Sequence, residues 1–153
     1  MTNPIPSGFH TLTPALVTDG AAAAIDFYVR AFGAEVKLRL DAGETVAHAE
    51  LRIGDSLLTL CDPMPDYGLV APDREGPVTS SLMLYCEDVD AVHARAMAEG
   101  ATLITEVSDQ FHGNRGGAVR DPFGHRWVIA TCIEDVDGAE MQRRLDASMG
   151  ANA

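Results

Sequence analysis

The sequence predicts an α+β fold built from two βαβββ units, and three observations support this prediction. The chain has 153 residues, about the size of one ordinary domain with a full hydrophobic core. Its hydrophobic content of 46% and charged content of 22% are typical of a folded globular protein. The same order of strand and helix patterns occurs twice, in residues 11–61 and 79–132. Such a repeat indicates an internal duplication.

The first unit begins with a short apolar strand that leads into a helix. Residues 12–17 are apolar and end at the turn signal Asp19-Gly20. Apolar side chains then recur at three- and four-residue steps as far as Gly33, which predicts a helix over 20–32 with Asp19 as its N-cap. Three strands joined by turns follow, and they span residues 35–40, 45–53 and 56–61.

The second unit follows a linker rich in Pro, Gly and Asp, over residues 62–77, which either lies on the surface or folds across a site. Its helix is expected to start at Asp88 and to end at Gly100. Its strands are expected over residues 80–85, 101–107, 117–120 and 126–132. The polar, glycine-containing loop 109–117 could form a lid or a plain β-connection. A C-terminal amphipathic helix is expected over about 137–149, with an apolar stripe formed by Met141, Leu145 and Met149.

The charge balance limits the classes of partner. Eleven Lys and Arg against 23 Asp and Glu give a formal net charge of −12, which argues against nucleic acid and anionic membranes. The same charge would attract a cationic ligand. The three cysteines, Cys61, Cys86 and Cys132, form no CxxC pair and suit a reducing compartment as small buried hydrophobes. With no signal-peptide pattern and no run of about 18 apolar residues, the sequence predicts a cytoplasmic protein.

Several phrases of the sequence are similar to those of one known family. The first unit contains Thr13-Pro14, the run AIDFY at residues 24–28, AFGA at 31–34 and HAELRIGDS at 48–56. The second contains DQF at residues 109–111 and RDPFGHRW at 120–127. These phrases resemble the vicinal oxygen chelate superfamily of glyoxalase I, extradiol dioxygenases and bleomycin-resistance proteins, and within it the PhnB-like subgroup. The resemblance implies an incomplete eight-stranded barrel with outer helices, and a homodimer.

The resemblance also implies where metal-using members of the family place their ligands. Matching the helix and turn phrases puts these four positions on Thr13, Thr59, Ser81 and Val128. Hydroxyl and isopropyl groups are poor ligands for nickel, zinc or iron, which prefer imidazole or carboxylate. We therefore expect no metal and no cofactor at these positions, although ligands relocated elsewhere stay possible.

Side-chain alternation suggests which residues face the cleft of such a barrel. Along residues 45–53 the apolar side chains alternate with His48, Glu50 and Arg52, which should project into the cleft. A His and a Glu two residues apart could act as a base with its orienting partner, bind a relocated metal, or form a structural ion pair. Trp127, next to Val128, should lie under a helix. The full set of predicted ligand-binding residues is His48, Glu50, Arg52, Thr13, Thr59, Ser81, Met83, Tyr85 and Phe111.

Two classes of function are compatible with these features. The first is a protein that binds a small organic molecule in a cleft without the metal ligands of the family. The second is an enzyme, either a metal-dependent lyase, isomerase or dioxygenase with relocated ligands, or a metal-free catalyst that uses His48 and Glu50. The sequence favours the binding protein because the four ligand positions carry the wrong side chains.

Overall fold

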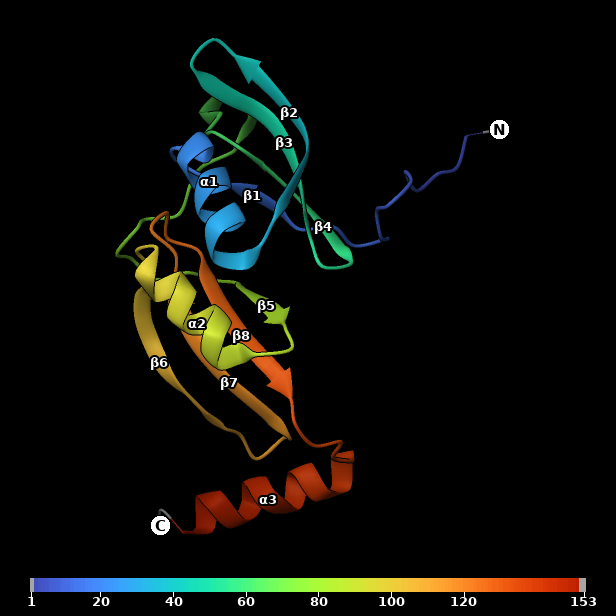
Figure 1. The fold of residues 1–153 in the computed structure, drawn as a ribbon, viewed down its shortest axis with the longest axis vertical. Coiled ribbons are helices and arrows are strands. Elements are labelled where there is room, and N and C mark those ends of the chain that lie inside the picture. The colour runs from blue at the N-terminus through green and yellow to red at the C-terminus, as the bar shows by residue number, and fades with distance from the viewer. Residues whose placement is uncertain (1, 152–153) are drawn as a thin grey trace.

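The computed structural model describes residues 2–151 and contains the two units in the predicted order (Figure 1). The first unit comprises β1 (Ala15–Val17), α1 (Ala21–Phe32), β2 (Glu35–Ala42), β3 (Thr45–Ile53) and β4 (Ser56–Cys61). The second comprises β5 (Ser81–Tyr85), α2 (Val89–Ala98), β6 (Thr102–Asp109), β7 (Asn114–Arg120) and β8 (Arg126–Cys132). A short 3-10 helix, η1 (Pro65–Tyr67), lies in the linker, and α3 (Gly138–Gly150) follows β8.

Each unit forms one four-stranded mixed sheet. The strand order is β1-β4-β3-β2 in the first sheet and β5-β8-β7-β6 in the second. In both sheets the first strand pairs in parallel with the last, and the other ladders are antiparallel. The described strands form no ladder between the two sheets, so the eight strands make an open, incomplete barrel. The predicted α+β fold of two βαβββ units is therefore confirmed.

An aromatic cluster joins the two units behind their sheets, where α1 packs against α2. The rings of Phe32 and Trp127 lie 4.6 Å apart between centroids, and those of Tyr28 and Trp127 lie 5.4 Å apart. Phe27 meets Phe123 edge to face at 6.3 Å. All five rings are buried, so one hydrophobic core extends across both units. The prediction that Trp127 is a core residue is confirmed.

The N-terminus of α1 is capped by a residue from outside its own segment. Gly20 has a φ of 85°, in the left-handed region, and no side chain of the N-cap residue takes part. Instead, one oxygen of the Asp62 carboxylate accepts hydrogen bonds from the backbone N–H groups of Gly20 and Ala21, at 3.1 and 3.0 Å. The expectation that Asp19 caps this helix is wrong, because the left-handed turn at Gly20 separates it from the first helical turn. Asp88 does cap α2, as expected.

Most of the predicted loop 109–117 is strand rather than lid. β6 and β7 approach each other so closely that residues 110–113 alone connect them, with the N–H of Gly113 donating to the carbonyl of Gln110 at 3.1 Å. Gly117 lies within β7, and a Cβ there would come within 2.9 Å of the Thr105 carbonyl oxygen, so the close approach of β6 requires glycine at this position. The loop is thus a β-connection.

The linker between the units is fastened to the second unit. One guanidinium nitrogen of Arg120 donates to the carbonyls of Arg74, at 3.1 Å, and Gly76, at 2.6 Å. The guanidinium of Arg74 in turn lies 5.7 Å from the ring centroid of Phe123. This part of the linker therefore has a fixed position against the turn that precedes β8.

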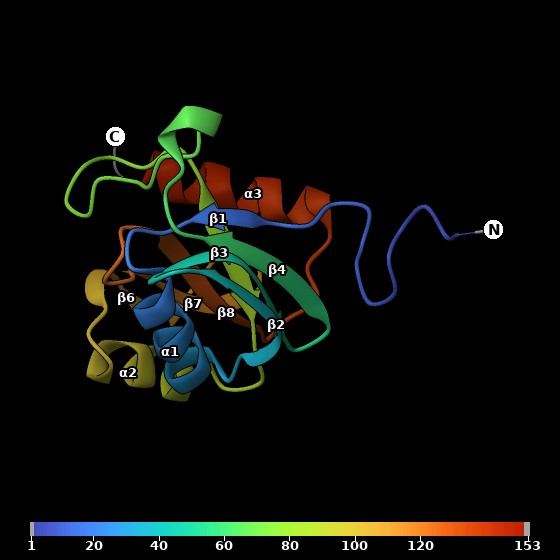
Figure 2. The ribbon, with the colours of Figure 1, turned by 90° about the horizontal axis from the view of Figure 1, so that it is seen from above.

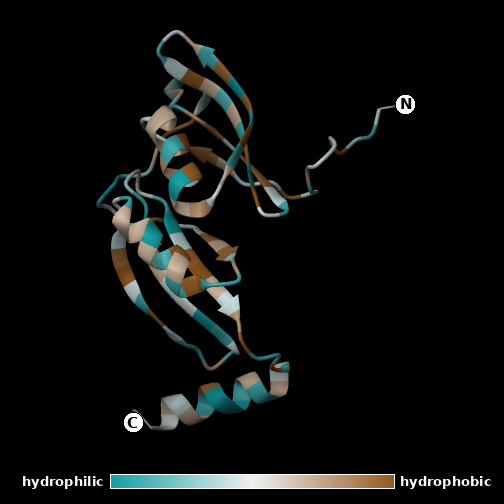
Figure 3. Ribbon diagram, in the orientation of Figure 1, coloured by the Kyte–Doolittle hydropathy of each residue, from teal (hydrophilic) through white to brown (hydrophobic). Residues whose placement is uncertain are grey.

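The two ends of the described chain differ in how they meet the body. The N-terminal segment extends away from the body in two perpendicular views (Figures 1 and 2). α3 lies beyond the far end of the second sheet and mixes hydrophilic with a few hydrophobic residues (Figure 3). It begins at the N-cap Asp137, close to the predicted boundary, and none of its described residues is buried. No helix within residues 2–151 has the length and apolar character needed to cross a lipid bilayer.

Candidate functional site

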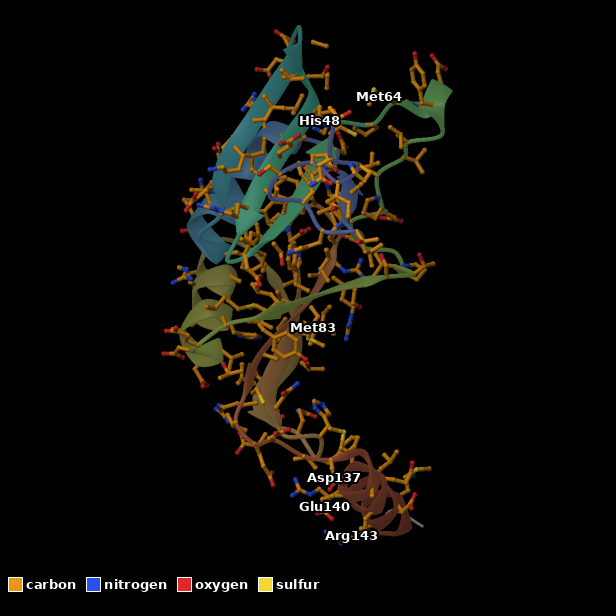
Figure 4. All side chains as sticks on the ribbon, turned by 90° about the vertical axis from the view of Figure 1, so that its right-hand side faces the viewer. His48, Met64, Met83, Asp137, Glu140 and Arg143 are labelled. Carbon is orange, nitrogen blue, oxygen red and sulfur yellow. The ribbon has the colours of Figure 1, made fainter. Side chains whose placement is uncertain are left out.

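The candidate site is formed by the faces of the two sheets that point away from α1 and α2, which we call the open faces. In Figure 4 the two helices lie at one side, whereas His48 and Met83 lie toward the other. The helix-facing residues of β3, such as Ala49 and Leu51, are fully buried. The open faces are only partly covered, so they are where a ligand could reach the sheets.

The open face of the first sheet carries the pair predicted from alternation along β3. His48 Nε2 lies 3.3 Å from Glu50 Oε1, with the side chains 41% and 23% exposed. Leu40 is the cross-strand partner of His48, and Leu38 that of Glu50. Directly opposed residues of a ladder share a face, so two leucines flank the polar pair. The alternation fails only near the start of β3, where a register irregularity buries Val46 in place of its neighbour.

The other predicted residues of the first unit are less closely grouped. Thr59 in β4 pairs directly with Glu50 and therefore lies beside it. Arg52 also projects from β3, but its guanidinium donates to Glu35 at 2.6 Å. Thr13 precedes β1, which starts later than predicted, and its hydroxyl donates to the carbonyl of His10 at 3.1 Å. The structure thus groups His48, Glu50 and Thr59, and leaves Thr13 apart.

The open face of the second sheet brings together the three predicted residues of β5. Ser81, Met83 and Tyr85 alternate with helix-facing leucines, and Met83 and Tyr85 are 53% and 60% exposed. The adjacent strand β8 contributes Val128, opposite Met83, and a residue that the sequence analysis missed, Arg126. The guanidinium of Arg126 donates to the hydroxyl of Ser81 at 2.6 Å. The alternation that placed Val128 in the cleft would also have placed Arg126 there.

A depression of about 330 Å³ lies on this face, and we call it the second-sheet hollow. Its floor consists of small or branched side chains on the two inner strands, namely Gly116, Ala118, Val128 and Ala130. Polar side chains from β6, β7 and the turn between them surround it, namely Thr105, Glu106, Ser108, Gln110, His112 and Asn114. Met83, Gly117 and Arg126 complete the lining. A glycine and two alanines leave room above the sheet for a flat molecule.

A second, larger pocket of about 560 Å³ lies between the two units. The N-terminal segment, the β3–β4 turn and β5 form its walls, and Phe32 and Trp127 reach it from the core. Met83 borders both this inter-unit pocket and the second-sheet hollow, whereas Tyr85 borders the inter-unit pocket. His48 and Glu50 line neither. Phe111, in the turn before β7, is 40% exposed and also lies outside both linings.

The thiols near these surfaces are poor nucleophiles. Burial raises the pKa of Cys61, and the neighbouring Asp62 charge raises it further. Burial likewise raises the pKa of Cys86, which borders the inter-unit pocket. Both thiols therefore stay protonated near neutral pH. Cys132 is exposed and the other two are only partly buried, so the prediction that the three cysteines are buried is wrong.

The residues at the four family ligand positions do not fit a divalent metal. Ser81 in β5 and Val128 in β8 lie on neighbouring strands, and Thr59 lies in β4, whereas Thr13 precedes β1. Their side chains are nevertheless three hydroxyls and one isopropyl group, which offer no imidazole or carboxylate. Across residues 2–151, no three His, Cys, Asp or Glu side chains are grouped closely enough to hold an ion.

The paired sheets, the outer helices and the open faces define the class of glyoxalase-like proteins. The chain belongs to the Glyoxalase/Bleomycin resistance protein/Dioxygenase superfamily, whose profile matches residues 9–129. An uncharacterised protein of Mycobacterium bovis is 38% identical over 140 residues, which cover 89% of this chain and 92% of that protein. The resemblance to this superfamily inferred from the sequence phrases is therefore confirmed.

Solved structures agree with this assignment. TioX from Micromonospora sp. ML1 superimposes with a TM-score of 0.66 and 27% identity, over 80% of this chain and 98% of that one. The gene product At5g48480 of Arabidopsis thaliana superimposes with a TM-score of 0.64 and 26% identity, again over 80% and 98%. A PhnB protein from Bacillus cereus shares the fold, with a TM-score of 0.63 and 20% identity over 80% of this chain and 99% of that one.

Proposed function

We propose that this protein binds a small organic molecule on the open faces of its sheets, as a cytoplasmic homodimer. The observation that carries the proposal is the exposure of Met83 and Tyr85 beside the small-residue floor of the second-sheet hollow. A thioether adapts to irregular apolar shapes, and a phenol offers a flat surface with one hydrogen-bonding group. Asn114 already donates to the Tyr85 hydroxyl, at 3.4 Å, and so orients it.

The proposed homodimer rests on apolar side chains that one chain leaves uncovered. Leu38 and Leu40 lie together on the first open face and are 39% and 52% exposed, and Met149 is 67% exposed on α3, which lies at the opposite end of the molecule from β2 (Figure 1). Large exposed apolar side chains that lie together are typical of interaction surfaces. A second copy that covered them would also enclose the open faces and remove water from a bound ligand.

His48 and Glu50 are proposed to contact the ligand from the first sheet. Their hydrogen-bonded pair is half exposed and has two leucines beside it, which gives a polar centre with an apolar border. Such a combination fixes the orientation of a ligand that is mostly apolar.

A thermal-shift screen with a panel of small organic compounds tests the binding function. A compound that binds the folded protein raises its melting temperature in proportion to the logarithm of its concentration. His48→Ala and Glu50→Gln should reduce that shift while the melting temperature of the free protein changes little. Equal loss of stability in both variants, with an unchanged shift, would mean that this strand face is structural.

Light scattering at tens of micromolar tests the homodimer. We expect twice the monomer mass for the full chain. Removal of the chain from Asp137 onward should weaken the dimer if α3 crosses the interface, and leave it intact if α3 covers only its own subunit. A monomer mass for the full chain would contradict the proposal.

A further inference from the structure

Two arginines lie side by side on the open face of the second sheet. Arg120 in β7 and Arg126 in β8 are direct cross-strand partners, so their side chains leave the sheet on the same face. Like charges placed directly opposite each other in a ladder destabilise it. This pair is therefore a cost to the free protein unless something negative lies nearby.

No carboxylate of the described residues neutralises this pair. Arg120 donates to the backbone carbonyls of the linker, and Arg126 donates to the Ser81 hydroxyl, but neither forms an ion pair within residues 2–151. The chain has 23 Asp and Glu for 11 Lys and Arg, so a carboxylate partner would be easy to supply. Most of the other arginines do have one, as Arg115 does with Asp90 at 2.8 Å.

One of these two arginines without a carboxylate partner, Arg126, lies in the lining of the second-sheet hollow. Arg126 lines the second-sheet hollow at the end where β8 begins, and the small floor residues follow along the same strand and its neighbour. Glu106, the one carboxylate among the lining residues, is on β6. β6 is two strands away from β8 in the sheet, a separation of about 10 Å. Glu106 is exposed to solvent there, so the Arg126 end of the hollow keeps its positive charge.

We propose that the second-sheet hollow binds an organic anion whose acidic group lies on Arg126 and whose flat apolar body covers the floor between Met83 and β6. A guanidinium binds a carboxylate, sulfonate or phosphonate with two parallel hydrogen bonds, and Ser81 holds this one in place. The inference rests on the proposed binding function and names its ligand class. It differs from the cationic ligand that the net charge of −12 suggests, because local charge decides which group is bound once the ligand has arrived.

Two flat fluorescent dyes of opposite charge test the proposal. We expect the anionic dye 1-anilinonaphthalene-8-sulfonate to bind the full-length protein more tightly than the cationic dye thioflavin T. Arg126→Gln should weaken binding of the anionic dye about tenfold or more, and Arg126→Lys by less, because lysine keeps the charge but loses the second hydrogen bond. Arg39→Gln is the matched control, since it removes the same charge from a surface pair with Asp41.

Two further readouts separate binding from structure and place the dye. The melting temperature of Arg126→Gln should equal or exceed that of the parent, because the substitution relieves repulsion from Arg120. Ser108→Trp, at an exposed wall of the hollow, should abolish binding of the anionic dye at this site. Binding of the anionic dye that survives both Arg126→Gln and Ser108→Trp would overturn the ligand class and leave the binding function standing. Preference for thioflavin T, or failure of both dyes to bind, would likewise overturn the ligand class, and the thermal-shift screen decides the binding function separately.

Discussion

The hydroxyl of Tyr28 in α1 donates a hydrogen bond to the carboxylate of Asp121, 2.7 Å away, across the boundary between the two units. The same carboxylate oxygen accepts from the indole N–H of Trp127 at 2.9 Å. The other oxygen accepts from the backbone N–H groups of Phe123 and His125. Burial, and then the charge of Asp121, raise the pKa of Tyr28 well above its usual value, so this phenol remains a donor. The relative position of the two open faces depends on this buried junction.

We predict that Tyr28→Phe lowers the free energy of unfolding by about 1.5–3 kcal/mol, because it removes one hydrogen bond to a buried charged group. Asp121→Asn should cost more, at least about 3 kcal/mol, because the new amide N–H₂ would face two buried donors. Urea denaturation measures both values. Tyr67→Phe, at a side chain that is 82% exposed, is the control and should change stability by less than about 0.5 kcal/mol. An equally small effect of Tyr28→Phe would show that the junction does not stabilise the fold.

The cap of α1 gives a second prediction that separates sequence proximity from structure. Asp62→Ala should destabilise the protein by about 1–2 kcal/mol, because three backbone N–H groups lose their acceptor. Asp19→Ala should cost less than about 0.5 kcal/mol, although Asp19 is the nearer residue in the chain. Chemical denaturation of the two variants side by side gives the comparison. A larger loss for Asp19→Ala would contradict the assignment of Asp62 as the cap.

These two cases show which features the sequence could predict. The bounds of β3, β4 and β8 agree with the predicted ranges, because alternation and glycine turns are local signals. The Asp62 cap depends on a contact across 42 positions of the chain, which no local pattern reveals. Phe111 is predicted as a site residue only because it is apolar within a polar loop, and the structure places it in the turn between β6 and β7.

The candidate site also has some features that a local pattern predicts and others that depend on contacts between strands. Period-two alternation predicts that His48 and Glu50 share one face of β3. It also predicts that Ser81, Met83 and Tyr85 share one face of β5. The cross-strand pair of Arg120 and Arg126 depends on the register between β7 and β8, which the sequence does not specify by itself. The sequence does not predict the hollow either, because Gly116 of its floor falls within the predicted loop 109–117.

The two faces of β3 should respond differently to truncation. Leu51→Ala should lower the free energy of unfolding by about 2–5 kcal/mol, because Leu51 is fully buried under α1 and its loss leaves a cavity. His48→Ala, three residues earlier on the open face, should cost about 1 kcal/mol or less, since a partly exposed hydrogen-bonded pair contributes little. Thermal and urea unfolding report both changes. Comparable losses would indicate that the open face is packed against another part of the molecule.

The ion pairs of α3 should weaken as the pH falls. Hydrogen bonds from Arg143 and then Arg144 lower the pKa of Glu140 to about 2, and Arg144 also lowers the pKa of Glu134. A carboxylate whose pKa is lowered in the folded state stabilises that state above its unfolded pKa of about 4.3, and this contribution is lost as the pH falls toward 2. Carbon-detected NMR of the Glu140 carboxyl should follow this titration. Arg143→Gln should raise the observed pKa, and an ordinary value in the parent would contradict the ion pairs of Glu140 within α3.

Gly113 provides the most direct test of how α3 is held to the second sheet. Its φ of 89° is left-handed, and a Cβ at this position would collide with the Glu134 carbonyl oxygen and lie 2.8 Å from a methyl group of Val136. Both residues belong to the segment that leads from β8 into α3, and Val136 is buried. Gly113→Ala should therefore displace this segment and break the hydrogen bond from Arg144 to the Phe111 carbonyl. Hydrogen exchange should show faster exchange in residues 133–150 of this variant. Gly43→Ala has a similar φ of 65° but open space around the new methyl group, so it should pay only the backbone strain and leave exchange in α3 unchanged.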